Sequence, residues 1–66
     1  MTIQLNGAPR YLVPGTTIAD AIAQLAATSD GIAVARNGEV VRRNDWAATT
    51  LEDGDQVEVV TAHQGG

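Results

Sequence analysis

The residues of this chain that could carry chemistry are few. His63 is the only histidine and the sequence has no cysteine, so we expect no metal site, because a metal needs several such ligands that converge. Ser29 and His63 could join an aspartate in a nucleophilic triad by residue type alone, but a chain of 66 residues has no room for a cavity that excludes water. We therefore predict that the chain has no catalytic residue and is not an enzyme.

The composition excludes further classes of function. The chain has four arginines, no lysine and eight acidic residues, which gives a net charge of −4. Nucleic acid and anionic membrane both require clustered positive charge, so we expect neither as a partner. The first residues, MTIQLNGAPR, lack the apolar run of a signal peptide, and no transmembrane stretch follows. We expect a soluble, cytoplasmic protein.

Several polar segments have both a structural and a functional interpretation. Residues 14–17 (PGTT) could bind an anion on free N–H groups at the start of a helix, but we favour a turn and a helix cap. We interpret Arg42 and Arg43 as a solvated pair and Trp46 as a core residue rather than a partner contact. Residues 39–66 hold two arginines against six acidic residues, a net charge of −4. We interpret this as a solvated acidic surface; the alternative is a surface that steers docking to a basic partner.

The remaining candidate is the Gly65-Gly66 pair. Glycine lacks a Cβ, so such a pair could pass through a narrow channel in another protein. We predict a domain of residues 1–61 followed by a flexible tail of residues 62–66. Five extended residues reach about 17 Å, which is enough to enter a partner's site. A glycine pair is also compatible with a frayed end of no function, so its meaning depends on the elements before it.

The first half of the chain predicts a hairpin and one helix. Residues 2–5 alternate polar and apolar, Asn6-Gly7 favours a tight turn, and residues 10–13 form the expected return strand. Apolar side chains at helical spacing predict a helix over residues 17–27, with Thr17 as its N-cap.

The second half predicts three more strands. We expect a hairpin of residues 32–36 and 39–42 around Asn37-Gly38, followed by a loop or one short helical turn over 44–50. A turn at 53–55 and a final strand over 56–61 come next. The order β-β-α-β-β-β indicates the α+β class, with one main helix packed on one face of a sheet. The pattern alone does not determine the strand order. The expected core is Ile3, Leu5, Ile18, Ile22, Leu25, Ile32, Val34, Leu51, Val57 and Val59.

This order of elements, together with Gly65-Gly66, resembles the ubiquitin-like β-grasp carriers. Residues 31–38 (GIAVARNG), 41–46 (VRRNDW) and 51–59 (LEDGDQVEV) are similar to the ThiS family, the sulfur carriers of thiamine thiazole synthesis. Arg42 departs from the family, in which proline is common at that position. The resemblance spans essentially the whole chain and implies a mixed five-strand sheet whose first and last strands are parallel neighbours.

The resemblance also implies chemistry at Gly66. An E1-like adenylating enzyme of the ThiF or MoeB type would activate the Gly66 carboxylate with ATP, and a sulfur donor enzyme would supply the sulfur that turns it into a thiocarboxylate. Gly65 would be recognised as part of the tail, and a thiazole synthase of the ThiG type would receive the sulfur. The chain would bind no cofactor and would act as a cosubstrate.

Four alternatives remain open. The chain could be a MoaD-like small subunit of molybdopterin synthase, or a thiocarboxylate carrier for cysteine or natural-product biosynthesis. It could also be a ubiquitin-like protein modifier, or a binding module with no covalent role. Genomic neighbours, conjugates in cell lysate and the effect of tail deletion would distinguish these alternatives.

Overall fold

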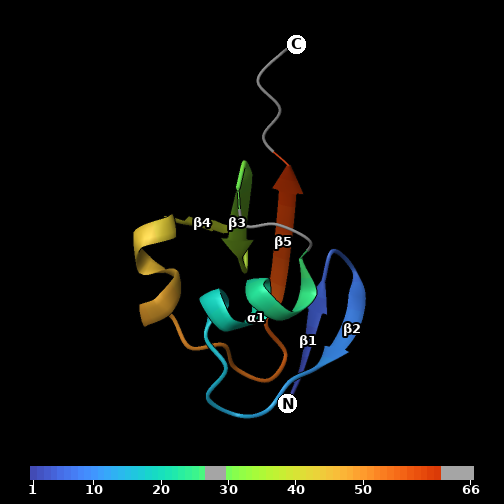
Figure 1. Cartoon of the computed structure of the whole chain (residues 1–66). Helices are drawn as coiled ribbons and strands as arrows, with labels where there is room; N and C mark the ends of the chain where they lie inside the picture. Colours follow the sequence, from blue (N-terminus) through green and yellow to red (C-terminus); the bar gives the residue numbers. More distant parts are fainter. Residues whose placement is uncertain (27–29, 62–66) are drawn as a thin grey trace.

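In the part of the chain that the structure describes, five strands form one mixed sheet, and one α-helix covers one of its faces (Figure 1). The computed structural model describes residues 1–26 and 30–61. The strand order is β2-β1-β5-β3-β4, with β1 (Thr2–Leu5) parallel to β5 (Gln56–Thr61). The α+β class and the parallel pairing of the first and last strands are therefore confirmed. The other elements are β2 (Ala8–Tyr11), α1 (Ile18–Leu25), β3 (Ile32–Arg36), β4 (Glu39–Val41) and a 3-10 helix, η1 (Arg43–Ala48).

Both hairpins turn on an Asn-Gly pair, as predicted. Asn6 and Asn37 each have a φ of 51°, and Gly7 and Gly38 follow at 83° and 86°. A two-residue hairpin turn of this kind needs a left-handed backbone at both positions, and asparagine and glycine tolerate it best. The two turns therefore share one backbone geometry, although their hairpins lie on opposite sides of β5 in the sheet.

The return strands begin or end earlier than predicted. β2 covers residues 8–11 rather than 10–13, because Leu5 pairs with Ala8 directly across the two-residue turn. Pro9 lies inside β2, where a missing N–H is tolerated because β2 is an edge strand. β4 ends at Val41, one residue before the predicted end.

α1 begins where the sequence predicts. The Thr17 side chain accepts a hydrogen bond from the Asp20 backbone N–H at 3.1 Å, and the Asp20 carboxylate accepts one from the Thr17 N–H at 3.3 Å. This reciprocal capping box satisfies N–H groups that have no partner within the helix. The helix ends at Leu25, and the predicted end at Ala27 lies outside the described residues.

Residues 43–48 form the 3-10 helix η1, so the segment predicted as a loop or one short helical turn is helical and starts one residue earlier. Trp46 is buried, and its Nε1–H donates to the Val41 carbonyl at 2.9 Å. The Arg43 guanidinium lies 5.4 Å from the centre of the Trp46 ring and 3.6 Å from the Asp30 carboxylate. Trp46 is thus a core residue, and both Arg42 and Arg43 are exposed to solvent, as expected.

The core lies between α1 and the sheet face that α1 covers (Figure 1). Leu12 and Ala21 are buried although the sequence did not predict it. Leu12 was missed because its burial depends on where β2 ends, which the alternating pattern did not determine. Of the predicted core residues, Ile3, Ile18, Ile22, Val34, Leu51 and Val57 are buried, and Leu5, Leu25, Ile32 and Val59 are partly buried against them.

Candidate functional site

The predicted site residues Gly65 and Gly66 lie outside the described residues, as do His63 and Ser29. What the structure describes is the strand that leads to the glycines. β5 ends at Thr61, where the sequence predicts that the domain ends, and it has a neighbouring strand on each side.

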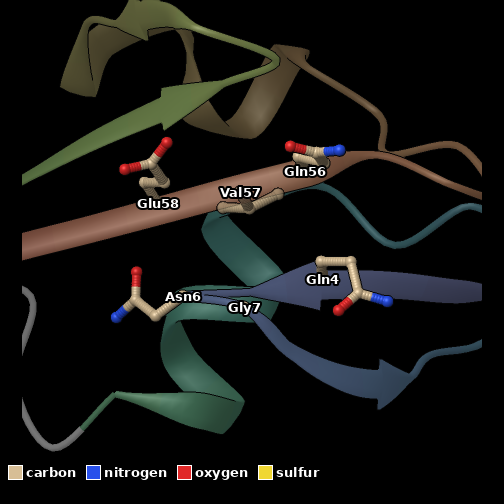
Figure 2. Close-up of a pocket in the computed structure, with 6 residues that line it drawn as sticks. All are labelled: Gln4, Asn6, Gly7, Gln56, Val57 and Glu58. Carbon is tan, nitrogen blue, oxygen red and sulfur yellow. The ribbon is translucent and has the colours of Figure 1, made fainter.

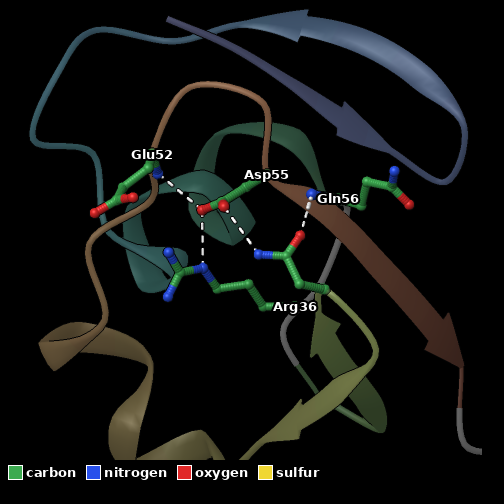
Figure 3. A network of polar contacts seen from close by, with 5 residues as sticks. Arg36, Glu52, Asp55 and Gln56 are labelled. Carbon is green, nitrogen blue, oxygen red and sulfur yellow. Dashed lines mark hydrogen bonds and ion pairs between the residues drawn. The ribbon is translucent and has the colours of Figure 1, made fainter.

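A buried carboxylate holds the start of β5 (Figure 3). Asp55 is 6% exposed and accepts hydrogen bonds from Arg36 Nε at 2.8 Å, Asn37 Nδ2 at 3.0 Å and the Glu52 backbone N–H at 2.8 Å. Burial raises the pKa of Asp55, but the hydrogen bonds from Asn37, Glu52 and Arg36 and the charge of Arg36 together lower that pKa below its ordinary value. Asp55 is therefore an ionised anchor between β3 and the loop before β5.

Asn37 joins this anchor to the first residue of β5. Its Oδ1 accepts a hydrogen bond from the Gln56 N–H at 2.9 Å, and its own backbone N–H donates to the Gln56 carbonyl at 2.7 Å. The turn of the second hairpin is thereby tied to the point at which β5 begins.

Asn6 makes a similar connection on the other side of β5, nearer to its end. Its backbone N–H donates to the Val57 carbonyl at 2.9 Å. Its side-chain Oδ1 accepts from the Val59 N–H at 2.8 Å, and its Nδ2 donates to the Val59 carbonyl at 3.1 Å. The sequence pattern predicts Asn6 and Asn37 as turn residues only. Their contacts with β5 were missed because the partners are distant in the chain.

The sheet face opposite α1 is polar over β1 and β5. A hollow there is lined by Gln4, Gln56 and Glu58 together with Asn6, Gly7 and Val57 (Figure 2). One carboxylate among amides is not a set of ligands that holds a metal firmly. Within residues 1–26 and 30–61, no group of three or more His, Cys, Asp or Glu side chains is placed to bind a metal ion.

The same face is apolar over β3, β4 and the end of β5. Val40 is 77% exposed and Val60 57%, and both line a small depression with Ala33 and Ala35. Glu58 lies at its border, since it pairs with Ala35. We call Ala33, Ala35, Val40 and Val60 the apolar patch. We treat the apolar patch as a candidate for contact with another protein.

Residues 14–17, which could have bound an anion, form a turn and the N-terminal cap of α1. Thr16 is buried, and its hydroxyl donates to the Val13 carbonyl at 2.6 Å. The N–H of Ile18 donates to the Thr49 carbonyl at 2.9 Å, and the N–H of Asp20 donates to the Thr17 side chain. These N–H groups at the start of α1 are thus occupied within the protein.

Part of the acidic second half is also structural. Asp55 is the anchor described above, and Asp53 accepts a hydrogen bond from the Thr2 N–H at 2.7 Å. Glu52 and Glu58 are exposed. The exposed acidic side chains of this half, Glu52, Asp53 and Glu58 among them, remain candidates for steering a basic partner, and the steering itself stays a prediction.

In the described part of the chain, no helix is long and apolar enough to cross a membrane.

The ThiS family model matches residues 3–66. The sulfur carrier protein ThiS of Escherichia coli is 32% identical over the full length of both chains, and that of Thermus thermophilus is 38% identical over 97% of this chain and 98% of its own. A crystal structure of the thiamine biosynthesis protein ThiS from Geobacter metallireducens superposes with a TM-score of 0.89 at 32% identity, covering all of both chains.

A thiazole synthase of Magnetococcus marinus is 39% identical to this chain over 66 residues, and one of Paramagnetospirillum magneticum is 32% identical. The chain spans only 20% of the length of each of these two proteins. The family match, by contrast, covers nearly the whole chain, and the solved relative has the same β-grasp fold. The chain belongs to the ThiS family.

Proposed function

We propose that this protein is a sulfur carrier whose Gly66 carboxylate is converted to a thiocarboxylate that supplies sulfur for the thiazole of thiamine. One observation carries the proposal: the match to the ThiS family runs from residue 3 to residue 66 and so includes both glycines. The end-to-end similarity to two sulfur carrier proteins supports the same role. In this role the chain is a cosubstrate and contributes no catalytic residue.

The chemistry requires activation of the carboxylate. The Gly66 carboxylate attacks the α-phosphorus of ATP, and pyrophosphate leaves. Hydrogen sulfide ion then attacks the acyl carbon of the adenylate, AMP leaves with the bonding electrons, and one proton is released, so the product is a thiocarboxylate. Its sulfur is a better nucleophile than the original oxygen.

We assign the adenylation to a separate E1-like enzyme of the ThiF or MoeB type. The sequence has no lysine and no glycine-rich phosphate loop with which to hold ATP itself. Gly65 and Gly66 have no Cβ and can enter a narrow channel in that enzyme. The apolar patch lies beside the last residues of β5, where a partner that receives the tail would contact the domain. Because ATP is consumed, we place the reaction in the cytoplasm.

A thiazole synthase of the ThiG type is the proposed sulfur acceptor. In the two proteins named thiazole synthase, one fifth of the length is similar to all of this chain, so a carrier-like region and the rest of the synthase share one polypeptide. Covalent linkage of that kind raises the effective concentration of one partner for the other. This arrangement in relatives supports an encounter between this carrier and a synthase.

The test is the intact mass of the protein after incubation with ATP, sulfide and the E1-like enzyme of its own host. We expect a gain equal to one oxygen-to-sulfur exchange, and fragmentation should locate it at Gly66. Gly65→Val should impair the exchange through bulk in the channel, whereas His63→Ala should leave it intact because the partner supplies the chemistry. The absence of a mass change with every adenylating enzyme of the host would refute the proposal.

A further inference from the structure

The two sides of β5 are paired to different lengths. On one side β3 pairs with β5 to its last residue, Thr61, which lies opposite Ile32. On the other side β1 pairs with β5 only as far as Val57, because the chain turns away at Asn6. Residues 58–61 of β5 therefore extend past the end of β1, and these are the residues from which the chain continues to Gly65 and Gly66.

The side chain of Asn6 takes the place of the missing strand residue. A primary amide carries the same C=O and N–H groups as a peptide unit, and Asn6 uses both on one residue, Val59. Its backbone N–H meanwhile bonds the Val57 carbonyl, which is the preceding β5 group on that side. Asn6 thus extends the pairing of β5 from Val57 to Val59, and Figure 2 shows its side chain pointing toward β5.

Asn37 provides an internal comparison. It has the same φ of 51° in the same kind of turn, and it also bonds β5 through its side chain. Its partners are Gln56, the first residue of β5, and Asp55, whereas Asn6 holds Val59, two residues before Thr61. One asparagine therefore secures the start of the strand and the other secures its end.

We propose that Asn6 is a positioning residue: by holding Val59 it fixes the end of β5 and thereby the direction in which the chain leaves toward Gly66. The proposal rests on the proposed function, since the direction matters only if Gly66 must reach a partner's site. Without the Asn6 bonds, residues 59–61 are paired on the β3 side only, and the end of the strand can shift on the side of β1. Loss of the strand's orientation then slows the reaction at Gly66, because misplacement of a reacting group slows a reaction steeply.

Two substitutions at Asn6 separate its side chain from its backbone. Asn6→Gly removes both hydrogen bonds to Val59 but still accepts a positive φ, so the turn is preserved. Asn6→Asp keeps an oxygen that accepts from the Val59 N–H but has no N–H to donate to the Val59 carbonyl. Asn37→Gly is the matched control, with the same substitution in the same turn geometry at the other end of β5.

The measurements are amide exchange at Val59, ¹⁵N relaxation at Val60 and Thr61, and kcat and KM for thiocarboxylate formation by the host's E1-like enzyme. All are made far below the melting temperature of every variant. For Asn6→Gly we expect exchange at Val59 to accelerate about tenfold, as the loss of such hydrogen bonds implies. We also expect kcat to fall about three- to tenfold, while KM stays unchanged because the apolar patch is intact.

Asn6→Asp should also accelerate exchange at Val59 and lower kcat, because a carboxylate oxygen faces the Val59 carbonyl in place of the N–H that bonds it. Asn37→Gly should lower the melting temperature but leave kcat unchanged. If kcat of Asn6→Gly equals that of the wild type, or if kcat and melting temperature fall in the same proportion in both glycine variants, Asn6 has no positioning role. A wild-type protein that gains no sulfur would refute the proposed function instead. In that case amide exchange at Val59 and relaxation at Val60 and Thr61 still test the inference. Values for Asn6→Gly equal to those of the wild type would overturn it.

Discussion

Asp55→Asn tests how strongly the start of β5 is held. The carboxylate accepts hydrogen bonds from Arg36 and Asn37, which are adjacent at the end of β3, and from Glu52 in the loop before β5. A hydrogen bond to a charged group contributes about 1.5–3 kcal/mol, and asparagine retains only one oxygen to accept with. Its NH₂ group would face donors, leaving at least one of them without an acceptor.

The expected cost to the free energy of unfolding is about 2–4 kcal/mol at pH 7. The Arg36 side chain is 27% exposed, so water can hydrate part of its guanidinium once the carboxylate is gone. The cost therefore stays below that of breaking a fully buried ion pair. A domain of this size has a total stability of about 3–10 kcal/mol. The single substitution should therefore remove a large part of the stability, which urea denaturation of both proteins would measure.

The pH dependence gives an independent check. The pKa of Asp55 in the folded protein lies below its ordinary value of 3.8. The stabilisation from its charge is therefore fully present above about pH 3.8 and is lost as the pH falls through the folded-state pKa. We expect the difference in unfolding free energy between the wild type and Asp55→Asn to shrink below that pH.

The matched control is Asp53→Asn, which removes the same charge from the same turn. Asp53 accepts one exposed hydrogen bond, from the Thr2 N–H, and an asparagine oxygen can still accept it. Its cost should stay within about 0.5 kcal/mol. An equal cost for Asp53→Asn and Asp55→Asn, or a difference that does not depend on pH, would contradict this account of Asp55.

Three further outcomes are expected. Deletion of Gly65-Gly66 should leave the melting temperature nearly unchanged, because an exposed terminus contributes little burial; a large drop in a thermal scan would show that the tail is packed. Ile22→Ala should cost about 2–5 kcal/mol in urea denaturation, since Ile22 is buried between α1 and the sheet; a cost near zero would contradict its place in the core. Neutralisation of the exposed Glu52 and Glu58 should slow association with the adenylating enzyme and flatten its salt dependence in stopped-flow measurements, and a rate indifferent to ionic strength in the wild type would exclude steering.

The sequence by itself determined the features that depend on neighbours in the chain. The Asn-Gly turns, the Thr17 cap and the final strand over residues 56–61 follow from local rules: a positive φ, a side chain within reach of the next turn, and alternating burial. The resemblance that predicts chemistry at Gly66 also used contiguous segments. Such signals survive in a single sequence because the interacting atoms are only a few residues apart.

Only the tertiary structure decided what depends on distant residues. The strand order, the start of β2 at Ala8 and the burial of Leu12 depend on pairing between strands, which a period-two pattern does not specify. The contact between Asn6 and Val59 joins residues 53 positions apart, and a turn-forming asparagine gives no sign of it. A side-chain amide can bond the backbone of any residue type, so the sequence does not reveal its partner. The contact of Asn6 with the end of β5 became visible only once the strands were placed side by side.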